Sequence, residues 1–139
     1  MNAAPCFIDD LSITKVAENP KPIFRLNHQF RFRSKIYQGI INVPEGFPTD
    51  FASVPRLPLA YLAAGGCGDE AAVIHDFLFS THLVGFMVAN KIFLEAMKCM
   101  GVSLWRRNVM FGFVCAFGWI LYLKGPDKLE KIKKAPQTN

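Results

Sequence analysis

The chain has 139 residues, a formal net charge of +5 and a hydrophobic content of 51%. This length suits one domain with a single core, and the hydrophobic content excludes a mostly disordered chain. The basic residues are spread along the sequence, which is compatible with an acidic partner such as phospholipid headgroups or nucleic acid, but a solvated basic face is the favoured explanation.

The N-terminal residues, MNAAPCFIDDLS, lack the basic and apolar stretches of a signal peptide. We therefore expect synthesis in the cytoplasm of the host cell. The four cysteines are isolated from one another and from zinc-ligand spacing. They are Cys6, Cys67, Cys99 and Cys115, and the pattern predicts buried free thiols in a reducing compartment.

Short β-branched or aromatic segments fill the region from Leu11 to Val43 and are separated by prolines and a glycine. They read LSITKV, PIFRL, HQFRFRS and GIINV, and they predict a small antiparallel sheet. Phe30 and Phe32 alternate with Arg31 and Arg33, which places the rings on the core face and the guanidinium groups outside. Strand alternation explains this pattern without nucleic acid, and no specific nucleic-acid binding is expected.

A proline-rich stretch, VPEGFPTDFASVPRLP, follows from Val43 to Pro58. Its prolines exclude a regular helix or a central strand, so it predicts an ordered loop. Thr49, Asp50 and Ser53, followed by Arg56, form a candidate functional motif there. Such side chains also stabilise turns by bonding to backbone amides, and that interpretation is favoured on the residues alone.

Three helices are predicted after the loop, which makes the fold class α+β. The first begins at Asp69 as N-cap and is broken by Gly85, and the second runs from Phe86 to Met100 and ends at Gly101. The third runs from Ser103, its N-cap, to about Lys124 and is stopped by Gly125-Pro126. We therefore expect a single domain over residues 1–125 and a polar, basic tail over residues 126–139.

The third helix contains an apolar stretch without charge from Val109 to Leu123. At 1.5 Å per residue the stretch is roughly 22 Å long, short of the ~30 Å hydrocarbon core of a membrane, so it is not expected to span one. It can pack centrally, dock onto a partner or lie in a membrane interface beside Arg106, Arg107 and Lys124. A central or partner-bound position is favoured over membrane contact.

The first helix carries an adjacent pair, His75-Asp76, within the apolar sequence AAVIHDFLFS. Neighbouring helical residues point about 100° apart, so the two side chains need separate roles. His75 can act as a general base that Asn90 of the second helix orients, while Asp76 and carbonyls of Gly66 and Gly68 begin a calcium site. The alternative is that both are satisfied in the core, with Asp76 paired to the sheet or the loop, and this is favoured on the residues alone.

Three motifs in order carry a resemblance to a known family. They are VPEGFPTDFASVPR, AAVIHDFLF and VANKIFLEAMKCMGVSLWRR, and together they cover about Phe24 to Gly118. The sequence resembles a family of small phage and prophage proteins that is catalogued only as a domain of unknown function. The resemblance implies a phage or prophage origin but no established activity.

The helix pair in turn is similar, over two helices only, to the core of secreted and parvoviral phospholipases. That likeness implies His75 as base, Asp76 as calcium ligand, Asn90 in place of an orienting aspartate and Phe79 in place of a supporting tyrosine. Cys115 stands where the phage family has a basic residue. These departures replace polar functional groups with packing groups, and they favour a structural descendant over an efficient enzyme.

The sequence therefore predicts a phage-encoded accessory or virion-associated structural protein on a phospholipase-like scaffold. Its expected partners are phage structural proteins or a membrane surface, with homo-oligomers as a further expectation, and its expected location is the host cytoplasm, the virion or a membrane. The alternative is a calcium-dependent lipid or ester hydrolase that uses the His-Asp pair.

Overall fold

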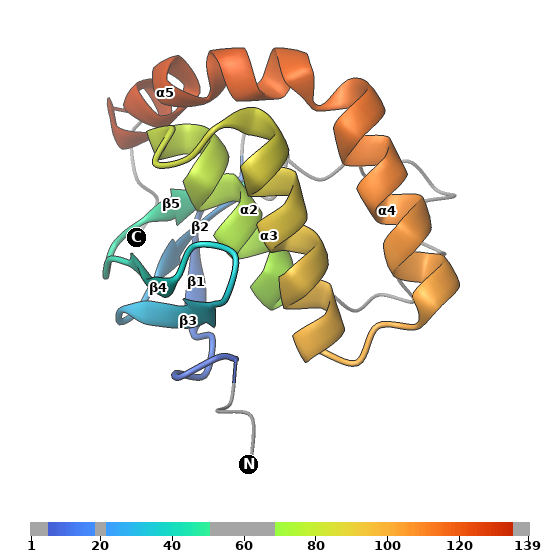
Figure 1. Ribbon diagram of the computed structural model, residues 1–139. Helices are drawn as coiled ribbons and strands as arrows, with labels where there is room; N and C mark the ends of the chain where they lie inside the picture. Colours follow the sequence, from blue (N-terminus) through green and yellow to red (C-terminus); the bar gives the residue numbers. More distant parts are fainter. Residues whose placement is uncertain (1–5, 19–21, 51–68, 135–139) are drawn as a thin grey trace.

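The computed structural model describes residues 6–18, 22–50 and 69–134, with strands in its N-terminal part and helices in its C-terminal part (Figure 1). The predicted α+β class is confirmed. The strands are β1 (Ile13–Ala17), β2 (Ile23–Leu26), β3 (Phe30–Ser34), β4 (Gly39–Val43) and β5 (Pro48–Thr49). The helices within the described residues are α2 (Asp69–Thr81), α3 (Phe86–Cys99), α4 (Leu104–Phe117) and α5 (Trp119–Lys134).

The strands form two antiparallel sheets instead of the single sheet that the sequence predicts. β1, β2 and β5 form a three-stranded sheet in that order, while β3 and β4 form a hairpin. Pro48 lies in the short edge strand β5, where a residue without an amide hydrogen is tolerated. β5 brings Thr49 and Asp50 from the proline-rich stretch next to the helices.

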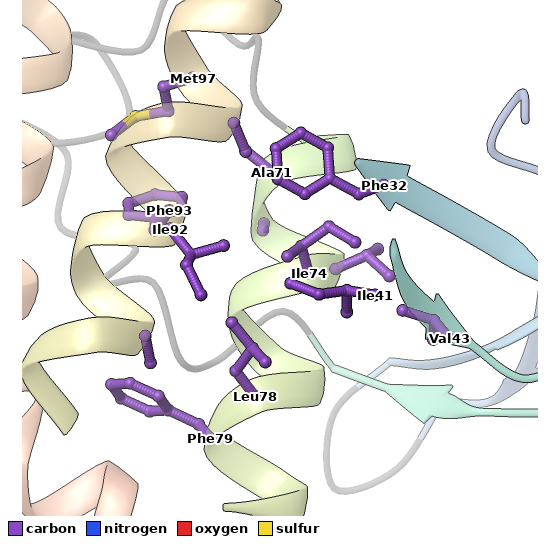
Figure 2. Packing of buried hydrophobic residues seen from close by; sticks show 14 of the residues in the cluster. Phe32, Ile41, Val43, Ala71, Ile74, Leu78, Phe79, Ile92, Phe93 and Met97 are labelled. Atoms are coloured by element: carbon purple, nitrogen blue, oxygen red, sulfur yellow. The ribbon is translucent and has the colours of Figure 1, made fainter. Parts of the chain in front are cut away.

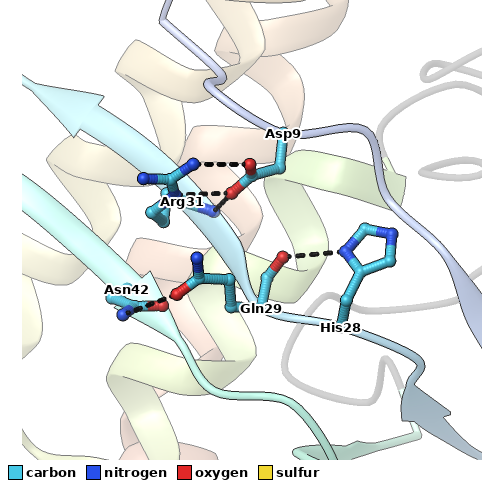
Figure 3. A network of polar contacts seen from close by, with 5 residues as sticks. All are labelled: Asp9, His28, Gln29, Arg31 and Asn42. Carbon is cyan, nitrogen blue, oxygen red and sulfur yellow. Dashed lines mark hydrogen bonds and ion pairs between the residues drawn. The ribbon is translucent and has the colours of Figure 1, made fainter.

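The predicted alternation along β3 is confirmed. Phe30 and Phe32 are buried, whereas Arg33 is exposed. The guanidinium group of Arg31 donates two hydrogen bonds of 2.8 Å to the carboxylate of Asp9 (Figure 3), and this interaction holds the pKa of Asp9 below its ordinary value. Arg31 therefore anchors the N-terminal segment to the hairpin.

The core lies between the β3–β4 hairpin and two antiparallel helices, with α2 in the middle. Figure 2 shows Phe32 and Ile41 of the hairpin pointing toward α2, while Ile92 points toward α2 from the α3 side. α2 is buried over most of its circumference, including the polar residues His75 and Asp76. A helix that is buried all round needs no amphipathic stripe, which explains the unbroken apolar sequence around the pair.

The second predicted helix agrees closely with α3. Its inward residues are Ala89, Ile92, Phe93, Ala96 and Met97, and all are buried. Gly101 follows the helix with a φ of 76°, a left-handed conformation that favours glycine at a helix end.

The third predicted helix is wrong at its C-terminal end, and the predicted stop at Gly125-Pro126 does not occur. The chain breaks at Gly118 into α4 and α5, which are bent by 77°, and α5 continues through both Gly125 and Pro126 to Lys134. A Cβ atom at Gly125 would collide with the carbonyl group of Phe79, so glycine lets α5 pack tightly on α2.

The proline is accommodated by a side chain from another segment. Pro126 has no amide hydrogen to donate to the carbonyl oxygen of Tyr122, four residues earlier. Nε2 of His82, just after α2, contacts that oxygen at 2.5 Å, and the imidazole ring stacks on the Tyr122 ring with centroids 3.9 Å apart. His82 therefore satisfies the carbonyl group that Pro126 leaves without its helical partner.

α4 is not a central core helix, which was one of the two favoured positions for the apolar helix, and the partner-bound position stays a prediction. Only Met110 and Val114 are buried among its fourteen residues. No single helix of the described residues is long and apolar enough to cross a membrane, although α4 and α5 taken together as a bent pair meet the length and hydropathy criteria. The helix that the sequence marks as most apolar thus lies at the outside of the fold.

The prediction of free thiols is wrong for two of the cysteines. Cys6 and Cys99 form a disulfide between the N-terminal segment and the end of α3, with Cα atoms 5.8 Å apart. The backbone of Arg33 donates a hydrogen bond to the carbonyl of Cys6, so the hairpin holds that segment in place. Cys115 is free and half-buried.

Candidate functional site

The predicted contact between the two helices at His75 is present. Nε2 of His75 lies 2.8 Å from Oδ1 of Asn90, and neither side chain has exposed surface. The imidazole ring packs against the rings of Phe79 and Phe93, with centroids 4.0 and 4.7 Å away. Burial lowers the pKa of His75 from 6.5 to about 4, although the hydrogen bond to Asn90 opposes this. His75 is therefore neutral at physiological pH.

The orientation of the Asn90 amide is fixed from its other side. Nδ2 of Asn90 donates to Sγ of Cys115 on α4 at 3.7 Å, which leaves Oδ1 to accept from the ring of His75. The ring must then carry its hydrogen on Nε2. An aspartate at position 90 has no N–H to donate to the sulfur, so the asparagine and Cys115 belong to one arrangement that joins α2, α3 and α4.

Asp76 faces the opposite way, toward β5 and α5. Its Oδ2 accepts a hydrogen bond of 2.5 Å from the hydroxyl of Thr49. Nζ of Lys128 lies 2.6 Å from Oδ1 of Asp50 and 3.6 Å from Oδ1 of Asp76. Both carboxylates are buried, so the ammonium group acts as their counter-ion within the fold. The expectation that Asp76 pairs with the proline-rich segment is confirmed.

Opposing effects act on the Asp76 carboxyl. Burial raises its pKa most strongly, while Lys128 and the hydrogen bond from Thr49 lower it and the nearby Asp50 raises it. The net direction is upward, which identifies Asp76 as a carboxyl group kept in a strongly desolvated position. Together with Thr49, Asp50 and Lys128, it forms a polar cluster that we call the Asp–Lys cluster.

Several predicted site residues can be placed and others cannot. Thr49, Asp50, Asp76, His75 and Asn90 lie together around α2. The remaining candidates, Ser53, Arg56, Gly66 and Gly68, lie outside the described residues. Within residues 6–18, 22–50 and 69–134, no group of three or more His, Cys, Asp or Glu side chains could hold a metal ion.

Sequence reasoning missed Lys128, because it assigned residues after Gly125 to a tail. A signal was available in the small and apolar residues Leu121, Gly125, Leu129 and Ile132, which repeat at intervals of four, four and three. This spacing continues one helix face past the proline. Ile132 indeed packs against Ala17 and Ile23 of the three-stranded sheet.

A pocket of about 420 Å³ opens beside the Asp–Lys cluster, between α2 and α5. Asp76, Phe79 and Ser80 contribute from α2, while α5 contributes Leu121 and several charged residues, among them Lys128. The pocket reaches the carboxyl side of the pair. His75 does not line it.

The comparisons with known proteins give a family and no activity. The family model described as "Protein of unknown function (DUF1353)" matches residues 24–114, which include β2 to β5, α2, α3 and most of α4. No curated protein and no solved structure matches the chain. Since the matched region covers more than half of the 139 residues, the chain belongs to the DUF1353 family of proteins of unknown function.

Proposed function

We propose that this protein is a phage-encoded accessory protein of the virion that acts by binding an anionic membrane surface, not by catalysis. The observation that carries the proposal is a set of exposed apolar side chains on α4 and the first half of α5. These side chains are each at least 50% exposed, and we call them the α4–α5 apolar surface: Leu104, Trp105, Phe117, Trp119, Ile120 and Leu123. Full burial of one such side chain contributes roughly 1.5–3 kcal/mol.

The chemistry of this surface favours a lipid interface over a protein partner. Trp105 and Trp119 stand near the two ends of α4, and tryptophan is enriched where hydrocarbon meets headgroups. Arg106, Arg107 and Lys124 flank the apolar stretch, as in helices that lie in the plane of an anionic interface. The net charge of +5 has the sign that such a surface attracts.

The interior of the candidate site supports a role without catalysis. His75 has no exposed surface and is bonded to a neutral amide that cannot offset an imidazolium charge. The carboxylate beside it already accepts a hydrogen bond from Thr49 and lies 3.6 Å from the ammonium group of Lys128. The Cys6–Cys99 disulfide also suits a virion component, which leaves the reducing cytoplasm when the host cell opens.

Flotation with lipid vesicles tests the proposal. The protein should float with phosphatidylglycerol vesicles, less with phosphatidylcholine vesicles, and less as salt is added, because exposed charges are screened. Replacing Trp119, Ile120 and Leu123 with glutamine should lower vesicle affinity by about tenfold or more. The matched control replaces Ile36 and Ile40, which are 43% and 47% exposed on the hairpin, with glutamine and should float like the native protein.

Failure of the native protein to float, or equal loss in both variants, would remove the membrane proposal. Cofractionation with virions that is lost in the Trp119, Ile120 and Leu123 variant, without flotation, would instead identify a protein assembly as the partner.

A second candidate is a calcium-dependent lipid or ester hydrolase, favoured by the 2.8 Å contact between His75 and Asn90 beside Asp76. Oxygen atoms of Asp50, Asp76 and Thr49 could contribute to a calcium shell, but the ammonium of Lys128 lies among them. Calcium should then raise the melting midpoint, and the K128Q variant should respond at lower calcium than the native protein. The D76N variant is the control. No shift at millimolar calcium in either the native or the K128Q protein excludes this candidate.

A further inference from the structure

The pocket between α2 and α5 has an apolar wall that the Asp–Lys cluster does not use. Phe79 of α2 and Leu121 of α5 line it, and Gly125 allows the two helices to approach closely at its base. A volume of about 420 Å³ is within the range of small-molecule sites, about 300–1,000 Å³.

Three lysines of α5 give the pocket its charge. Lys124, Lys128 and Lys131 all line it, and their spacing of four and three residues places them on one side of the helix. Lys128 is already paired with Asp50. Lys124 and Lys131 form no ion pair with any residue that the structure describes, so their charges remain available to a ligand.

A hydroxyl group supplies a neutral donor from the opposite helix. Ser80 lines the pocket and is only 5% exposed. Its hydroxyl makes no hydrogen bond within the described parts of the chain and is not fully enclosed, so it is open to a ligand in the pocket. A ligand with several acceptor oxygens would satisfy it.

The acidic residues of the pocket do not cancel this preference for an anion. Asp76 is turned to Thr49 and Lys128. Asp127 is exposed on the rim and makes no ion pair among the described residues. The charged side chains that line the pocket are three lysines and two aspartates, so the lining carries a net positive charge of one unit.

We propose that this pocket binds the phosphate group of a single anionic lipid. Lys124, Lys131 and the Ser80 hydroxyl donate to the phosphate oxygens, while Phe79 and Leu121 contact the adjoining apolar part of the lipid. The inference rests on the proposed membrane function, and it adds the headgroup chemistry that gives the protein its lipid preference. Ile120 and Leu123 of the α4–α5 apolar surface adjoin Lys124 in the same helix, so a lipid held in the pocket lies beside that surface.

The test uses soluble probes and the 139-residue chain. Titration calorimetry with monomeric dihexanoylphosphatidic acid should show one site, and inorganic phosphate should bind at least about tenfold more weakly because it lacks the apolar part. Dihexanoylglycerol, which has no phosphate, should not bind measurably. Equal affinity for inorganic phosphate and the lipid would overturn the lipid assignment and identify a free phosphate as the ligand.

Two double variants distinguish binding in the pocket from a general effect of positive charge on lipid affinity. The K124Q/K131Q and S80A variants should each lose about tenfold in affinity for dihexanoylphosphatidic acid, since they remove hydrogen bonds to a charged group. The K133Q/K134Q variant removes the same charge from exposed positions of the same helix that do not line the pocket, and it should bind like the native protein. Equal losses in the two lysine variants would overturn the proposal.

The two proposals fail in different ways. Flotation with vesicles but no binding of the monomeric lipid would overturn the pocket alone. Binding of the monomeric lipid without flotation would overturn the membrane function and leave the pocket as the site of a soluble phosphate-bearing amphiphile. Melting curves of each variant distinguish lost binding from lost folding.

Discussion

At the scale of single residues, His75 is stabilised as a neutral group. It is enclosed by Phe79 and Phe93 and donates to Asn90, so its charged form would lose hydration without gaining a counter-charge. A pKa of about 4 makes the imidazole a weak base for catalysis, whereas the neutral ring packs well in the core.

The buried imidazole should make stability depend on pH. Its pKa is about 4 in the folded chain, against the ordinary histidine value of 6.5 that applies once the chain unfolds, so between these values only the unfolded chain binds the proton. Stability should fall as pH decreases from about 6.5 to about 4, by roughly 3 kcal/mol at 1.36 kcal/mol per pKa unit. Urea unfolding at a series of pH values measures this.

The H75Q variant provides the reference, because glutamine can still donate to Asn90 but does not titrate in this range. Asp76, whose pKa is raised by burial, contributes a slope of opposite sign in both proteins. The stability difference between the native protein and the variant should therefore shrink on acidification. A constant difference would contradict the buried, neutral histidine.

The sequence could predict the contact between His75 and Asn90 but not the position of Lys128. Asn90 shares a face of α3 with Phe93 and Met97, so helical periodicity alone places it toward α2. Lys128 contacts Asp50 and Asp76 only because α5 folds back over α2. The apolar spacing along α5 predicts that the helix continues past Pro126, but it does not predict which element that face packs against. Long-range placement of a single charge depends on tertiary packing.

At the scale of elements, Gly118 and Gly125 act in the opposite way to the prediction. The predicted helix passes through Gly118 and stops at Gly125, whereas the observed helix ends at Gly118 and the next one continues through Gly125. Gly118 ends α4 and permits the bend, because a Cβ atom there would collide with the carbonyl oxygen of Val114. Gly125 lies inside α5, where its lack of a side chain allows close packing on Phe79. The helix-breaking propensity of Gly125 and Pro126 is therefore weaker than the tertiary contacts that hold α5 on α2.

Continuation of α5 past Pro126 should depend on His82. The H82F variant keeps a ring that can stack on Tyr122 but loses the donor to the Tyr122 carbonyl oxygen, and it should lower the free energy of unfolding by about 1 kcal/mol. In the P126A background the restored amide hydrogen can reach that oxygen. The same H82F change should then cost less, and a double-mutant cycle by urea unfolding measures the coupling. Identical costs in both backgrounds would show that the contact does not compensate for the proline.

At the scale of the whole molecule, the Cys6–Cys99 disulfide joins parts of the chain that the sequence gives no reason to pair. The two residues are 93 positions apart, and neither belongs to a recognisable cysteine motif. The addition of the N-terminal segment to β3, through the Phe7–Phe32 bridge, is what brings Cys6 to the end of α3. The strands, α2 and α3 were predictable because their local patterns agree with their burial.

Reduction of this disulfide should destabilise the fold. A bond that closes so long a loop restricts the unfolded chain, and its loss should lower the free energy of unfolding by about 2–5 kcal/mol. Urea unfolding with and without a reducing agent measures the change, and peptide mapping by mass spectrometry should find the two cysteines linked. The C6S/C99S variant should be insensitive to the reducing agent. Equal unfolding of native and reduced protein would contradict a stabilising bond.

The disulfide also divides the molecule in a way that secondary structure does not. It closes residues 6 to 99 into a covalent ring that contains β1 to β5, α2 and α3, whereas α4 and α5 both follow the ring. The two outer helices are held to it by noncovalent contacts such as those of Lys128 and His82. A rearrangement of α4 and α5 would leave this ring closed, so the two helices can change position without opening the covalently linked part of the fold.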